Sequence, residues 1–174
     1  MAASSDLVAI VNEDDKTIGQ AELEEVHKRG LFHREIFVFV ISLHQKEVLL
    51  RRKSDDKWTA PIDKHLLPYE DYLQAAQNSV TEKFGISLHQ KFFEELCSRK
   101  FKINYANGIN NCFIKSFIVK KNVSLSNYPI DKTDAVELRY FSKPVLYNLI
   151  KEKKWLDYIA MEILKKYVMH ELVL

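Results

Sequence analysis

One segment of the chain constrains its fold more than any other. Residues 34–43, REIFVFVISL, place β-branched and aromatic side chains on both faces of an extended strand. Such a strand is expected to be buried on both faces, whereas a strand with one face in water alternates between apolar and polar residues. We therefore expect this segment to be a central strand of a sheet that is covered on each side.

Further strands are predicted before and after this segment. Residues 7–23 are typical of a strand, a turn and a second short strand, and residues 47–54 form a strand after the turn at 44–46. The segments 93–105 and 110–121 are predicted to pair in an antiparallel manner around a turn at 106–108, and residues 135–141 add another strand.

Helical patterns alternate with these strands. Residues 24–30 form one or two helical turns ended by Gly30, and residues 71–84 repeat apolar side chains every three or four positions before Gly85. A third helix is expected over 142–153, with Ser142 as its cap and Pro144 in its first turn, and another from residue 155 to the C-terminus. The pattern predicts one α/β domain over residues 1–174, with its C-terminal helices at about 143–174.

Composition excludes several classes of protein. The net charge is +2, from 26 basic and 24 acidic residues, so no nucleic-acid or membrane partner is predicted. No apolar stretch is long enough to span a bilayer, and the N-terminus does not resemble a signal peptide. The spacing of Cys97 and Cys112 matches no zinc or disulfide pattern, which favours a reduced, cytoplasmic setting. The sequence leaves homo-oligomerisation open.

The order of these elements and several motifs resemble the Nudix superfamily, and most closely its branch near isopentenyl-diphosphate isomerase. The resemblance covers roughly residues 7–149. Its motifs are EEVHKRGLFHRE at 24–35, EVLLRRKS at 47–54, Trp58, KHLLPYED at 64–71, the alanines at 75 and 76, EKFGI at 82–86 and AVELRYFS at 135–142. The resemblance implies a Nudix-like α/β/α sandwich, with a mixed curved sheet and an extra C-terminal helix.

Residues 64–86 match the frame of the Nudix box without a gap. The box has a glycine, five residues, a glutamate, seven residues and then Arg-Glu-apolar-any-Glu-Glu-any-Gly-apolar. Glu70, Glu82, Gly85 and Ile86 match this pattern. The positions that depart from it are Lys64 for the opening glycine, Asn78 for the arginine, and Ser79 and Lys83 for two glutamates.

These departures remove most of the metal-binding carboxylates that the resemblance implies. Positions 79, 82 and 83 share one helix face, where Mg²⁺ or Mn²⁺ requires hard, negatively charged oxygen ligands. At ~4 Å and an effective dielectric constant of ~20, each unit charge contributes roughly 4 kcal/mol, so Lys83 reverses an interaction of that size. Glu82 and Glu70 remain as candidate catalytic residues, and Asn78 is expected to hydrogen-bond to Glu70.

The isomerase branch implies a second candidate site. Its catalytic cysteine aligns with Asp63, whereas His33 and His65 match two positions of its histidine-rich metal site. His27 lies near a third ligand position but is one residue out of step. Glu82, His33 and His65 are therefore the candidate metal ligands, and an alternative is that the histidines are simply hydrogen-bonded residues beside a cleft.

Basic residues suggest a site for phosphate groups. Arg51 and Lys53 are expected to share one side of a strand and to face Lys83 across a cleft. The first hypothesis is a Nudix-type protein with absent or much reduced diphosphate hydrolysis that binds a partner or a ligand, such as a small phosphate-containing compound. The second is an active hydrolase of nucleoside-diphosphate-linked or prenyl-diphosphate-like substrates. It would use a displaced metal site at Glu70 and Glu82 with Glu94, Glu95 or Glu137. The third is an interaction domain without a small-molecule site.

Overall fold

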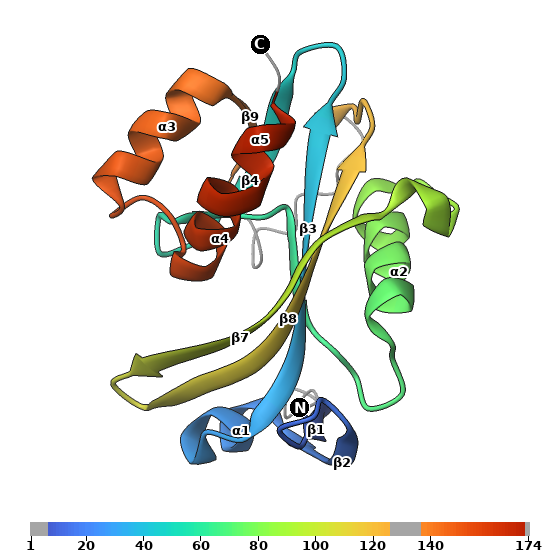
Figure 1. Ribbon diagram of the computed structural model, residues 1–174, viewed down its shortest axis with the longest axis vertical. Coiled ribbons are helices and arrows are strands. Elements are labelled where there is room, and N and C mark those ends of the chain that lie inside the picture. Colours follow the sequence, from blue (N-terminus) through green and yellow to red (C-terminus); the bar gives the residue numbers. More distant parts are fainter. Residues whose placement is uncertain (1–6, 126–136, 173–174) are drawn as a thin grey trace.

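A computed structural model describes residues 7–125 and 137–172 of the chain, and Figure 1 shows their arrangement. The strands are β1 (Leu7–Val11), β2 (Thr17–Glu22), β3 (Phe32–Ser42), β4 (Glu47–Arg52), β5 (Trp58–Thr59), β6 (Ile62–His65), β7 (Glu94–Tyr105), β8 (Gly108–Lys120) and β9 (Glu137–Ser142). The helices are α1 (Leu23–Arg29), α2 (Tyr72–Phe84), α3 (Lys143–Glu152), α4 (Tyr158–Ile163) and α5 (Met169–Glu171), with a 3₁₀ turn at Gln90–Phe92 and a π-helical turn at Leu164–Val168.

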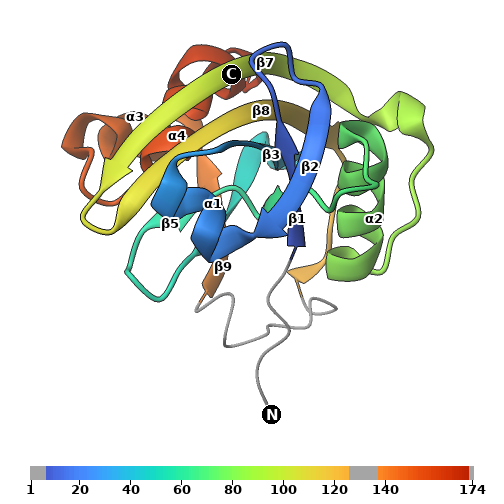
Figure 2. The same cartoon turned by 90° about the horizontal axis from the view of Figure 1, so that it is seen from below.

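The predicted central strand is the centre of a mixed sheet. β3 pairs with β8 in parallel and with β1, β4 and β6 in an antiparallel manner. β7 and β8 form the expected antiparallel hairpin, β2 pairs with β1, and β9 pairs with β4. Figure 2 shows β7 and β8 curving across the molecule from the side of α2 to the side of α3. The expected α/β architecture with a mixed, curved sheet is confirmed.

Two apolar cores lie on opposite faces of the sheet. Phe37, Phe39 and Ile41 of β3 belong to a core that includes residues of α3, α4 and the π-helical turn. The alternate residues Ile36, Val38 and Val40 of β3 belong to a second core that includes the buried face of α2. Because successive side chains of a strand point to opposite faces, these two cores explain the apolar character of both faces of residues 34–43. Figure 1 shows α3 and α4 on one side of β3 and α2 on the other.

The ends of α2 follow from local sequence. The carboxylate of Asp71 accepts a hydrogen bond of 2.8 Å from the backbone amide of Gln74, so Asp71 caps the first turn. Gly85 ends the helix in the left-handed conformation with φ of 65°. The predicted helix over 71–84 is thus correct to within one residue, and its apolar residues face the sheet.

The C-terminal region differs from the prediction of a helix that begins at residue 155. Trp155 and Leu156 precede the helix, whose first residue is Tyr158, because the Asp157 carboxylate accepts hydrogen bonds from the amides of Ile159 and Ala160. Ser142 occupies the cap position of α3 as predicted, but its side chain makes no capping hydrogen bond. Residues 135 and 136 of the predicted last strand lie outside the described residues. Within the described ranges, no helix combines the length and apolar character that crossing a bilayer would require.

Candidate functional site

Three histidines from three different elements meet at one end of the sheet. His27 lies on α1, His33 near the start of β3 and His65 at the end of β6. Gly30 ends α1 with φ of 64°, and the amide of Leu31 bonds to the carbonyl of Val26, so the chain reverses directly into β3. β6 pairs with β3 so that His65 is opposite Glu35, which places His65 diagonal to His33 on the same face.

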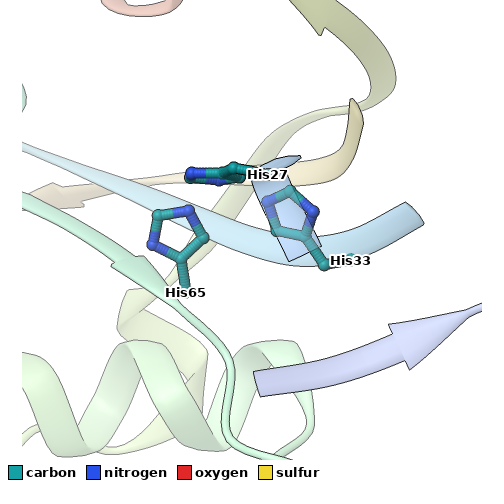
Figure 3. A group of neighbouring side chains, drawn as sticks. All are labelled: His27, His33 and His65. Carbon is teal, nitrogen blue, oxygen red and sulfur yellow. The ribbon is translucent and has the colours of Figure 1, made fainter. Parts of the chain in front are cut away.

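The three imidazole rings form a compact cluster, shown in Figure 3. Their centroids are 5.1 Å apart for His27 and His33, 5.4 Å for His27 and His65, and 5.1 Å for His33 and His65. One ligand nitrogen from each residue lies within 4.8 Å of the others. The Nε2 atoms of all three are buried and have no hydrogen-bond partner. Three unpartnered nitrogens that converge in this way form a donor set suited to a divalent metal ion.

The surroundings of the cluster favour neutral imidazoles. His33 Nδ1 lies 3.1 Å from the carbonyl oxygen of Leu31, so it donates its proton there and leaves the lone pair on Nε2. Burial lowers the pKa of His33 to about 4 and, with the neighbouring histidines, lowers the pKa of His65 to about 3. Burial also lowers the pKa of His27. Neutral imidazole is the form that binds a metal.

A cavity of about 390 Å³ opens beside this cluster. Its lining includes His27, His65, three carboxylates and residues from several distant parts of the sequence. The lining residues are His27, Glu35, Phe37, Lys53, Asp63, His65, Tyr105, Asn110, Asp157 and Ile159. This volume falls in the lower part of the range of small-molecule sites, so the cavity can hold an ion together with a small ligand.

Two of the three carboxylates in this cavity have strong partners. Asp63 forms an ion pair with Arg51 and accepts a hydrogen bond of 3.0 Å from the Thr59 hydroxyl. Asp157 caps α4 and lies 3.8 Å from the Lys53 ammonium. These contacts orient both side chains.

Glu35 is the third carboxylate, and it is only 7 % exposed. The uncharged side chains of Cys112 and Asn110 lie beside it, and its Oε2 atom has no hydrogen-bond partner. Burial, and then the charges of Asp63 and Asp157, raise the pKa of Glu35 to about 8.

The helix of the Nudix box is α2, and the carboxylates of the box are engaged differently from those of the cavity. Glu70 forms a 2.8 Å ion pair with Lys64 and accepts a 2.9 Å hydrogen bond from the amide of Leu67. The expected bond between Asn78 and Glu70 is wrong: the Asn78 amide oxygen instead accepts a hydrogen bond from Gln74, one turn earlier on the exposed side of the helix. The lysine at the opening position of the box therefore takes the role that the sequence suggested for Asn78.

The candidate metal ligands of the box do not gather at the histidines. Glu82 is exposed, and it lines a small pocket of about 180 Å³ with Ser79, Lys83 and Arg51. The alternative carboxylates are also elsewhere, since Glu94, Glu95 and Glu137 pair with Lys120, Lys115 and Arg52 respectively. The structure thus brings His33 and His65 together and leaves Glu82 in a separate pocket.

The three predicted phosphate-binding residues are divided between these two places. Arg51, which is only 4 % exposed, and Lys83 both line the pocket at the box helix. Lys53 lies beyond the end of β4 and lines the histidine cavity. The expectation that Arg51 and Lys53 face one cleft together is therefore not met, because strand alternation does not extend past Arg52.

Solved structures of other proteins share this architecture. DR0079 from Deinococcus radiodurans aligns with a TM-score of 0.71 over 93 % of this chain and 99 % of that one, at 13 % identity. A NUDIX hydrolase from Nitrosomonas europaea aligns with a TM-score of 0.52 over 79 % of this chain and 90 % of that one, at 18 % identity. The chain has the Nudix fold.

Sequence comparison relates part of this Nudix-fold chain to the isomerase branch. It is 33 % identical over 85 residues to an isopentenyl-diphosphate Delta-isomerase from Pectobacterium atrosepticum, a match over 45 % of this chain and 47 % of that protein. The chain thus spans about half the length of the curated relatives it matches. No family model matches the sequence. The resemblance to Nudix proteins near the isomerases is confirmed.

Sequence reasoning missed two residues of the histidine site within the Nudix fold. His27 was set aside because it is one residue out of step, but α1 turns its ring toward the other two. Glu35 was not considered, although a carboxylate beside the apolar run at 36–41 was a signal for a buried charge.

Proposed function

We propose that this Nudix-fold protein binds a divalent metal ion at His27, His33 and His65. A small phosphate-containing ligand would occupy the adjoining cavity, and diphosphate hydrolysis at the box helix would be absent. The observation that supports this most directly is that one ring nitrogen from each histidine lies within 4.8 Å of the others, and that the buried Nε2 atom of each has no hydrogen-bond partner. Buried polar atoms normally have partners. A metal ion would satisfy all three nitrogens at once.

The donor set favours a transition metal over magnesium. Imidazole nitrogen is a good ligand for Zn²⁺ and related ions, whereas Mg²⁺ prefers oxygen ligands. A bound divalent ion would supply Lewis-acid character and positive charge at the wall of the cavity. Lys53 also lines the cavity, near Asp157. An anionic ligand such as a phosphate ester or diphosphate would therefore bind chiefly to the metal ion, with Lys53 as a second cationic contact among the three carboxylates of the wall.

The box helix supports the absence of hydrolysis there. Ser79 is a neutral residue that is only 3 % exposed, and Lys83 places a positive charge in the same pocket. Glu70 is already paired with Lys64. The pocket has two carboxylates, and Asp63 is already paired with Arg51. The remaining carboxylate, Glu82, lies beside the Lys83 ammonium group, and such a pair is a poor magnesium site.

Metal titration tests the proposal. We expect calorimetry to show one Zn²⁺ or Mn²⁺ bound per chain, with an affinity that His65→Ala lowers at least ~100-fold, as expected for the loss of one of three ligands. His44→Ala is the matched control, since His44 is exposed in a turn. Binding of a diphosphate compound should depend on the metal, and no diphosphate should be hydrolysed. Metal binding that survives His65→Ala, or steady hydrolysis abolished by Glu82→Gln, would contradict the proposal.

A second candidate function is direct phosphate binding at the box pocket. Arg51, Lys64 and Lys83 line it, and the Ser79 hydroxyl there is buried without a hydrogen-bond partner. The volume of about 180 Å³ suits one phosphate group and not a nucleotide. This binding should persist in EDTA, weaken with salt and weaken in Lys83→Glu. Phosphate binding that disappears in EDTA and is unchanged in Lys83→Glu would assign the anion to the histidine cavity alone.

A further inference from the structure

We propose that Glu35 is the charge partner of the metal ion, an inference that rests on the proposed function. Three neutral histidines leave both charges of a divalent ion uncompensated, and burying an unpaired charge is costly. A carboxylate that faces the same cavity and is not engaged by a cation would offset that cost.

The placement of Glu35 meets this requirement. On β3 it is two residues beyond His33, so both side chains point to the same face of the sheet. On β6 its register partner is His65. Glu35 therefore lies next to two of the three histidines, and it lines the cavity together with His27 and His65.

The other carboxylates of the cavity are already engaged. Asp63 is paired with Arg51, and Asp157 caps α4 and lies near Lys53. Within the ranges that the structure describes, Glu35 forms no ion pair, and its contacts are with the uncharged side chains of Asn110 and Cys112. One of its oxygens, Oε2, has no partner.

A purely structural role would not require a carboxylate here. A glutamine at position 35 could keep the contacts with Asn110 and Cys112 without a buried acid, and it would fold at lower cost. The carboxylate of Glu35 is explained if the cavity binds a metal cation, because a neutral side chain would bind that cation less tightly. Removing Glu35 should thus change metal binding and metal-free stability in opposite directions.

The test uses the full chain and Zn²⁺ as the probe. Zn²⁺ affinity is measured by calorimetry with a competing chelator, and the melting temperature is measured in EDTA. We expect Glu35→Gln to bind Zn²⁺ roughly 10- to 100-fold more weakly than the unmodified chain, and to melt at a higher temperature in EDTA. Glu47→Gln is the matched control, because Glu47 is opposite Ser42 at the far end of β3, roughly 30 Å from His33 at strand spacing.

The possible failures are distinguishable. If the unmodified chain binds no Zn²⁺, the proposed function and this inference both fail. If the unmodified chain binds Zn²⁺ and Glu35→Gln binds it equally well, the metal site stands and the role of Glu35 is overturned. If Glu35→Gln lowers both Zn²⁺ affinity and the melting temperature in EDTA, Glu35 supports the local fold and is not the charge partner.

Discussion

A Cβ atom added to Gly108 would lie 2.6 Å from the carbonyl oxygen of His27. Gly108 is the first residue of β8, after the turn at 106–107, and it allows the β7–β8 hairpin to approach the backbone of α1. The sequence indicated only a turn at this place. The contact fixes the position of the helix that presents His27, so a glycine far from the histidines in the sequence contributes to their geometry.

Gly108→Ala should therefore damage the histidine cluster. The contact is with backbone, which cannot rotate away, so α1 or the hairpin must move, at a cost of about 1–3 kcal/mol in unfolding free energy. We expect weaker Zn²⁺ binding and a lower denaturant midpoint. Gly19→Ala is the control, since nothing lies within 4 Å of an added Cβ there. Equal metal affinity in the two variants would show that the position of α1 does not limit the site.

The stability of the metal-free protein should fall between pH 6.5 and pH 4. His33 and His65 have folded-state pKa values of about 4 and about 3, below the ordinary value of 6.5, so the unfolded chain binds more protons in this interval. Their contribution is complete above pH 6.5 and is lost as the pH falls, with a slope of up to about 1.4 kcal/mol per pH unit for each.

Denaturant unfolding in EDTA at several pH values measures this slope. Glu35 acts in the opposite direction, because its raised pKa makes stability fall as the pH rises from about 4.5 to about 8. The comparison is therefore between the unmodified chain and His33→Gln, which share Glu35. The variant should have a shallower dependence below pH 6.5, and identical slopes would contradict the assignment of buried, neutral histidines.

Restoring carboxylates at the box helix should create a magnesium site. Ser79→Glu combined with Lys83→Glu should raise Mg²⁺ affinity at least ~10-fold, since the second change replaces a repelling charge by an attracting one. Calorimetry with Mg²⁺ measures this effect, and Lys83→Gln separates the loss of repulsion from the gain of a ligand. The electrostatic argument fails if the unmodified chain already binds Mg²⁺ at micromolar concentration through Glu82.

The cap of α2 should affect stability without affecting the metal. Asp71→Ala removes the hydrogen bond to the Gln74 amide and should lower the free energy of unfolding by about 1 kcal/mol. Asp71→Ser should restore most of this loss, because serine is also a good cap. Zn²⁺ affinity should be the same in all three proteins. A loss of Zn²⁺ binding in Asp71→Ala would mean that the box helix and the histidine cavity are coupled.

The sequence by itself determined the elements whose causes are local. Strand 34–43 followed from apolar side chains on both faces, and α2 followed from its apolar spacing, Asp71 and Gly85. The alternation of strand and helix patterns correctly predicted a sheet between helices, and the resemblance of its motifs implied the Nudix-like form of that sheet. The resemblance to the Nudix box also identified Ser79 and Lys83 as residues that stand where the family has carboxylates.

Only the tertiary structure decided which of the remaining charged and histidine side chains lie together. Lys64 pairs with Glu70, and Arg51 with Asp63, because neighbouring strands and loops bring these charges together. His27 meets His33 and His65 because Gly30 reverses the chain and Gly108 admits the hairpin beside α1. Such contacts join residues that are far apart in the sequence, and their geometry depends on strand register and close packing, which no local pattern encodes.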